Sequence, residues 1–168
     1  MQQVSNEVWN SSLNLSALDG FYYSVFKGQS MSNSIHYRCD GVSLEKAVTE
    51  NFEEVSYEIF TKDGNKYFKF SIDTKTKDIT KTEIDLQAYE QVFAEMKINF
   101  SEMFIQDQFQ YQEMMGCYTL FQCNDMMDIY VSFRDNVLEN ITYTKNGEMY
   151  IYNFYFEIIE IPVPSLDK

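Results

Sequence analysis

The sequence closes with a run of aromatic and aliphatic residues, Tyr150 to Ile159, that would be apolar on both faces of a β-strand. Successive side chains of a strand point to opposite faces of the sheet. An antiparallel strand with one face in water shows polar residues at every second position, and this run does not. We therefore expect each face to be covered by a helix, a second layer, a partner or a ligand. One face carries Tyr150, Tyr152, Phe154, Phe156 and Ile158, and the other Met149, Ile151, Tyr155, Ile159 and Ile161.

Length and composition indicate one folded domain over residues 1–168, because 45% of the residues are hydrophobic and 17% are aromatic. The chain has 26 acidic against 13 basic residues, a formal charge of −13. The lysines between positions 62 and 81 are interleaved with acidic residues, so no basic stripe forms. This excludes nucleic acid as an expected partner. The acidic excess suits a basic protein partner instead.

Hydropathy predicts a protein that is not transmembrane, because no stretch approaches the roughly 20 apolar residues that a spanning helix needs. The first residues, Met1 to Ser5, do not form a signal peptide. We expect a protein that is extracellular or lipid-anchored if an export segment has been removed, and cytoplasmic otherwise. Cys117 and Cys123 lie on one predicted strand, too far apart to bridge. Three free thiols are favoured over a disulfide from Cys39 to one of them.

Periodicity predicts a mostly β chain with one helix near its N-terminus and a second near its middle. A short amphipathic helix falls within Gln3–Leu15. Alternation then predicts strands at Phe21–Lys27 and Ser34–Asp40, and a hairpin over Glu54–Ile72 that turns at Asp63-Gly64. The segment Val42–Glu50 fits either a strand or a turn.

A second helix is predicted to start at Thr82, where a hydroxyl precedes Asp85 by three residues. Apolar residues follow at three- and four-residue spacing. Beyond Met96 the segment could equally be extended. The apolar stripe comprises Leu86, Tyr89, Phe93, Met96, Phe100, Met103 and Phe104.

From Phe109 the period is two, with turns at Gly116, Asn124-Asp125, Asp135-Asn136 and Asn146-Gly147. These turns would join the last strands into a meander. The predicted fold class is therefore α+β: a large curved antiparallel sheet, a half-barrel meander, covered on its concave side by one or two helices.

Residues with catalytic chemistry are sparse. His36 is the only histidine, it lies in a predicted strand, and no strained serine turn accompanies it. One histidine and three scattered cysteines do not supply a zinc site, and no glycine-rich phosphate loop is present. Acidic pairs such as Asp125 and Asp128 fit solvated loops. We expect no catalytic residue, no metal and no cofactor, hence no enzyme.

The order of motifs resembles a known family. Trp9 comes first, followed by the hairpin Tyr57–Tyr67 with its Lys-Asp-Gly-Asn-Lys-Tyr turn. The later motifs are the helix with Tyr89, the stretch Phe109–Tyr118, the pairs Val131-x-Phe133, Ile141-x-Tyr143 and Tyr152-x-Phe154, and Glu160-Ile161-Pro162. This order is similar to that of the LolA-like lipoprotein domains secreted by Gram-positive bacteria. The start of the chain departs from that pattern, because it has no signal peptide and no lipobox cysteine.

The resemblance implies a half-barrel sheet with helices on its concave side, a hydrophobic cavity between them, and no catalytic residues. Relatives of that kind carry lipid or acyl chains, or have no known ligand. We therefore expect a non-enzymatic cell-envelope domain that holds a lipid or another hydrophobic molecule. The alternative is a small acidic interaction module, an inhibitor or immunity-type protein, that binds a basic partner. The residues expected to enclose the ligand are Phe93, Met96, Phe100, Tyr152, Phe154 and Phe156.

Overall fold

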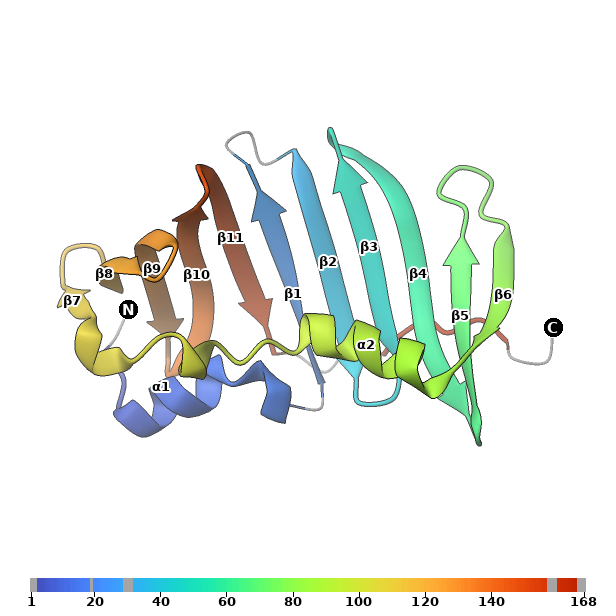
Figure 1. The fold of residues 1–168 in the computed structure, drawn as a ribbon, viewed down its shortest axis with the longest axis horizontal. Helices are drawn as coiled ribbons and strands as arrows, with labels where there is room; N and C mark the ends of the chain where they lie inside the picture. The colour runs from blue at the N-terminus through green and yellow to red at the C-terminus, as the bar shows by residue number, and fades with distance from the viewer. Residues whose placement is uncertain (1–2, 19, 29–31, 157–159, 166–168) are drawn as a thin grey trace.

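The described residues, 3–18, 20–28, 32–156 and 160–165, form one open antiparallel sheet of eleven strands in the computed structural model (Figure 1). The strands lie in the order β6-β5-β4-β3-β2-β1-β11-β10-β9-β8-β7, so the first strand pairs with the last. The strands are β1 (Gly20–Lys27), β2 (Asn33–Asp40), β3 (Leu44–Glu50), β4 (Glu53–Asp63), β5 (Lys66–Ile72), β6 (Ile79–Ile84), β7 (Gln110–Gln112), β8 (Cys117–Cys123), β9 (Met126–Arg134), β10 (Val137–Lys145) and β11 (Glu148–Tyr155).

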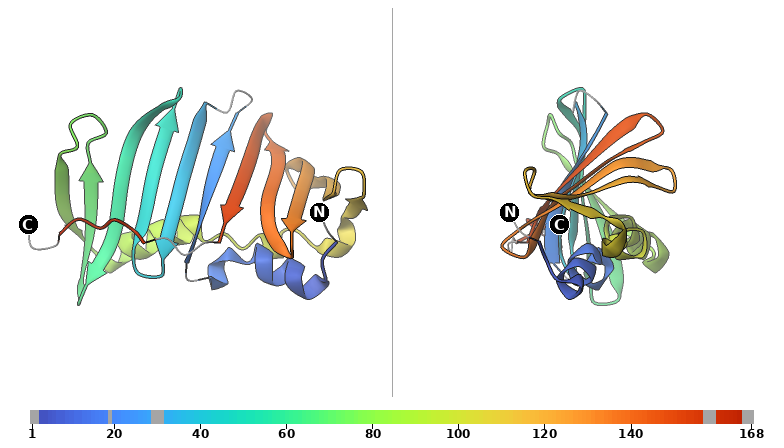
Figure 2. Two further views of the ribbon diagram at one scale, coloured as in Figure 1. Left: turned by 180° about the vertical axis from the view of Figure 1, so that it is seen from behind. Right: turned by 90° about the vertical axis from the view of Figure 1, so that its left-hand side faces the viewer.

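The helices lie on one face of this sheet, which we call the inner face (Figure 2). Helix α1 (Asn6–Leu13) packs near β10, and helix α2 (Leu86–Met96) crosses β2 to β4 (Figure 1). Short 3₁₀ turns complete the cover at η1 (Leu15–Ala17), η2 (Phe100–Glu102) and η3 (Gln106–Gln108). The α+β class expected from the sequence is confirmed, and the sheet does not close into a barrel.

Local turn chemistry accounts for the C-terminal meander. Asp135 and Asn136 both have positive φ between β9 and β10, and Asn146 and Gly147 do so between β10 and β11. Two-residue loops of this kind match the twist of the strands that they join. The segment that fits either a strand or a turn is a strand, β3, because β2 and β4 pair with it on its two sides.

The predicted start of the second helix is wrong. Residues Ile79–Ile84 form β6, which pairs with β5 along its whole length, so Thr82 lies in a strand. The helix is capped instead by the Asp85 carboxylate, which accepts a hydrogen bond from the Ala88 amide at 2.7 Å.

The sequence left open whether the segment beyond Met96 is helical or extended, and the structure shows that the helix ends there. It stops at Met96, because the following residues pair with the N-terminal segment: the Leu15 amide donates to the Ile98 carbonyl at 3.1 Å. Asn14 and Asn99 form an isolated antiparallel bridge beside that bond. Of the rest of the apolar stripe, Phe100 begins the 3₁₀ turn η2, Met103 caps its end, and Phe104 follows it. Phe100 and Phe104 are buried, so this part of the stripe still reaches the core.

Trp9 organises the core between α1 and the C-terminal strands. Its side chain is fully buried and its indole N–H donates to the Phe104 carbonyl at 2.9 Å. Its ring lies about 5 Å from those of Phe109 and Tyr118, and 5.8 Å from that of Phe133. This cluster ties the helical layer to the sheet.

The outer face of β11 was expected to be covered, but two of its side chains are exposed. Met149 and Tyr155 are 39% and 44% exposed. The last described segment packs elsewhere: Ile161 lies against Ile59 and Phe70 on the outer face of β4 and β5. Ile158 and Ile159 lie outside the described residues. Cys39, Cys117 and Cys123 form no disulfide among the described residues, as favoured from their spacing.

Candidate functional site

The inner faces of the central strands carry three rows of directly opposed residues. Tyrosines and a phenylalanine dominate the first row, and short aliphatic side chains occupy the second from β1 to β3. The rows are Phe154, Tyr23 and Tyr37; then Tyr152, Val25, Ile35 and Val48; then Tyr150, Lys27 and Asn33. Because longer side chains flank the aliphatic row, a trough forms along it.

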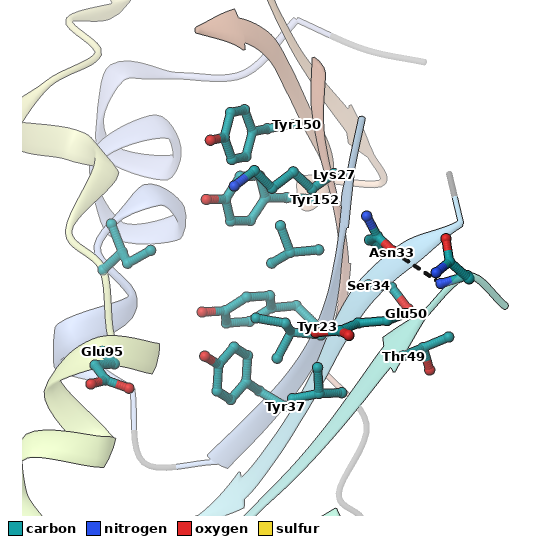
Figure 3. A pocket seen from close by; sticks show the side chains of 15 residues that line it. Tyr23, Lys27, Asn33, Ser34, Tyr37, Thr49, Glu50, Glu95, Tyr150 and Tyr152 are labelled. Carbon is teal, nitrogen blue, oxygen red and sulfur yellow. Dashed lines mark hydrogen bonds between the residues drawn. The ribbon is translucent and has the colours of Figure 1, made fainter. Parts of the chain in front are cut away.

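Helix α2 stops short of this trough. The Tyr89 hydroxyl donates to the Val42 carbonyl, and the Tyr23 hydroxyl donates to the Met96 carbonyl at 2.8 Å. Both bonds hold the helix over one end of the strands, and the chain then continues through Ile98 toward η2 (Figure 1). A cavity of about 570 Å³ remains between the sheet and the end of the helix (Figure 3).

The cavity has an aromatic and aliphatic floor and a charged rim. Figure 3 shows Glu95 of α2 facing the hydroxyl ends of Tyr23 and Tyr37, with Lys27 at the other end beside Tyr150 and Tyr152. The Lys27 ammonium lies 3.3 Å from the Glu148 carboxylate. The full lining is Tyr23, Val25, Lys27, Asn33, Ser34, Ile35, Tyr37, Val48, Thr49, Glu50, Asn51, Glu95, Ile98, Tyr150 and Tyr152.

Burial holds three tyrosines of the lining, Tyr23, Tyr37 and Tyr152, in their neutral form. Burial raises the pKa of Tyr23 and that of Tyr152. Burial, with the nearby Glu95 charge, raises the pKa of Tyr37 to about 12. The Tyr143 and Tyr152 hydroxyls lie 3.2 Å apart, and burial also raises the pKa of Tyr143. At neutral pH these hydroxyls are therefore uncharged.

Alkaline unfolding should follow from these raised pKa values. An unfolded tyrosine loses its proton near pH 10, whereas the folded protein keeps Tyr37 protonated to about pH 12. The stabilisation is therefore fully present below pH 10 and is lost as pH rises from 10 toward 12. We expect phenolate absorbance at 295 nm to rise together with the loss of near-ultraviolet circular dichroism. Complete phenolate formation near pH 10 with the dichroism retained would contradict the buried cluster.

The residues predicted to enclose the ligand lie mostly beside the cavity. Only Tyr152 lines it. Met96, Phe100 and Phe154 are at most 5% exposed and fill the core next to it. The Phe93 ring is tilted against that of Tyr89, with the ring centres 4.9 Å apart, and the Phe156 ring lies 6.3 Å from that of Phe154. Sequence reasoning missed the aliphatic row, whose only signal is apolar residues at alternate positions of predicted strands.

His36 lies on the outer face, away from the cavity. Its Nδ1 is 2.7 Å from the Ser24 hydroxyl, and its Nε2 is 3.3 Å from the Ser34 hydroxyl. Both serines are buried. Both imidazole nitrogens are thus occupied by hydroxyl groups, and the histidine acts here as a bridge between neighbouring strands.

The described residues supply neither a metal-binding cluster nor a membrane-spanning helix. In that part of the chain, no three acidic, histidine or cysteine side chains come close enough together to hold a metal ion. None of the helices described there is long and apolar enough to cross a bilayer. No protein-family model matches the chain, and no curated protein matches it in sequence.

Proposed function

We propose that this protein is a non-enzymatic binding domain that holds the apolar part of a lipid, or a similar hydrophobic molecule, in the cavity between β1–β3, β11 and α2. The observation that carries the proposal is the uncovered aliphatic row. Val25, Ile35 and Val48 lie side by side on the inner face, yet each is only partly buried, while the rows on the same sheet beneath α1 and η2 are filled.

The size and lining of the cavity support a small-molecule ligand. Ligand pockets typically enclose about 300–1,000 Å³ and combine apolar walls with a few polar groups at fixed places. A volume of about 570 Å³ falls within that range. Apolar area that a ligand would cover contributes about 25 cal/mol per Å² to its binding. The aliphatic row is the part of the inner face whose apolar surface a ligand can still cover, and covering it would contribute to binding.

The motif order supports the same proposal from the sequence side. The LolA-like lipoprotein domains that it resembles are expected to have an open sheet with helices on one face and a cavity between them. An open sheet covered on one face is what this chain forms. On that basis we propose a cell-envelope protein and a ligand delivered from or held near a membrane.

Native mass spectrometry of the purified protein, before and after denaturation, tests this proposal. We expect the native protein to carry a non-covalent mass of lipid size, or to take up one monoolein per chain when it is incubated with that lipid. The Ile35→Trp variant should carry neither, because the indole would occupy the trough. A wild-type protein that stays bare after incubation, or an Ile35→Trp variant that binds as much, would overturn the proposal. A bare mass would favour the acidic protein-interaction module.

A further inference from the structure

The charged residues that line the cavity carry a net negative charge. Among the lining residues, Glu50 and Glu95 oppose the single cation Lys27, which leaves one negative charge in excess. Lys27 is already paired with Glu148 at 3.3 Å, and hydrogen bonding to Glu148 raises the Lys27 pKa. Glu50 has no ion-pair partner among the described residues. An anionic ligand would therefore meet a neutralised lysine and two carboxylates.

The carboxylate on α2 is only partly neutralised by its own cation. Glu95 is 47% exposed at its side chain, and its ion pair with Lys46 is long, at 3.9 Å. Figure 3 shows the Glu95 carboxylate on α2, facing the hydroxyl ends of Tyr23 and Tyr37. A cation at this end of the cavity would be attracted by a carboxylate that its own lysine partner only partly neutralises.

Tyrosine rings supply the second half of a cation site. The rings of Tyr23 and Tyr37 lie 5.4 Å apart on the floor, and that of Tyr150 lies at the far end. The protein's own ammonium groups already approach two of these rings. The Lys46 ammonium lies 5.9 Å from the centre of the Tyr37 ring, and that of Lys27 lies 5.6 Å from the centre of the Tyr150 ring. The negative faces of aromatic rings attract cations at such distances.

We propose that the cavity selects amphiphiles with a positively charged head over those with a negative one. An ammonium or quaternary ammonium group would displace the Lys46 ammonium from its place between Glu95 and the Tyr37 ring, and its apolar chain would run along Val25, Ile35 and Val48. This inference rests on the proposed function, because it names the ligand class of the same cavity. The −13 charge of the whole chain would further raise the local concentration of cations.

Three probes with eight-carbon chains test the charge selection: octyltrimethylammonium, octanoate and octanol, each used below its aggregation concentration. Binding is followed by the methyl resonances of Val25, Ile35 and Val48, with Ile151 of the opposite face as an internal reference. We expect octyltrimethylammonium to bind at least about fivefold more tightly than octanoate, with octanol between them. The Ile151 methyl groups should not move.

Charge variants separate the site from the overall charge of the protein. Glu95→Gln should weaken octyltrimethylammonium binding about threefold to fivefold and leave octanol binding unchanged. Glu90→Gln changes the net charge equally on the same helix but lies outside the cavity lining, so it should change neither.

The outcomes distinguish the two proposals. Equal binding of the three probes, or tighter binding of octanoate, would overturn the charge selection and leave the hydrophobic cavity standing. An equal loss in Glu90→Gln and Glu95→Gln would also overturn it, because the effect would then be that of net charge. If none of the probes moved the cavity methyl groups, both proposals would fall.

Discussion

Replacing Trp9 with alanine should cost about 4 kcal/mol of folding stability, a large share of what a domain of this size has. The side chain is fully buried among Phe109, Tyr118 and Phe133, so its removal leaves a large void. The change also strips the Phe104 carbonyl of its indole donor. Urea denaturation followed by far-ultraviolet circular dichroism would measure the loss.

The matched variant Trp9→Phe separates the two contributions. It keeps an aromatic ring in the cluster and removes the N–H donor, so we expect a smaller loss of about 1–3 kcal/mol. Both variants lack the single tryptophan of the chain, which is why dichroism and not fluorescence serves as the signal. A Trp9→Ala protein within 1 kcal/mol of wild type would show that α1 is not anchored through this residue.

The sequence predicts the features that adjacent residues determine, and it misses those that depend on pairing with residues distant in the chain. The hairpins were predictable, because Asp135-Asn136 and Asn146-Gly147 carry their turn geometry in adjacent residues. Thr82 was misplaced because a hydroxyl three residues before an acid fits a helix start, whereas pairing with β5 keeps the segment extended. That pairing depends on residues outside the local pattern.

The strand order depends on contacts that no local pattern contains. β1 and β11 come from opposite ends of the chain, yet they pair so that Val25 lies opposite Tyr152. This pairing joins the two halves of the sheet and builds the floor of the cavity. Alternation places Val25 and Tyr152 on strand faces, but it does not say that those faces meet.

The sequence predicted a cavity between the sheet and a helix, but it did not predict most of the residues that line the cavity. A cavity between sheet and helix was expected, and Tyr152, one of the residues expected to enclose a ligand, lines the cavity that the structure contains. Met96, Phe100 and Phe154 are as apolar as the residues that line the cavity, but they are buried in the core beside it. Which apolar residues stay uncovered is set by where α2 ends and by the bond from Tyr23 to the Met96 carbonyl. Neither follows from hydropathy.

Filling the trough should weaken ligand binding at least about tenfold with little loss of stability, which is the second large effect expected. In Ile35→Trp the added ring would extend into the cavity from a half-buried position on the floor, where it meets open space and not packed core. Ile151→Trp is the control, since it introduces the same change at a half-buried isoleucine whose strand position, opposite Phe26, places it on the outer face.

The most direct test of the central claim is the fluorescence titration of these proteins with N-phenyl-1-naphthylamine, a neutral hydrophobic probe that brightens when it leaves water. The wild type and Ile151→Trp should bind it saturably and with equal affinity. Ile35→Trp should bind at least about tenfold more weakly, equivalent to about 1.4 kcal/mol, while it unfolds at a similar urea concentration. If Ile35→Trp bound the probe as tightly as the wild type, the cavity between the sheet and α2 would not be the binding site.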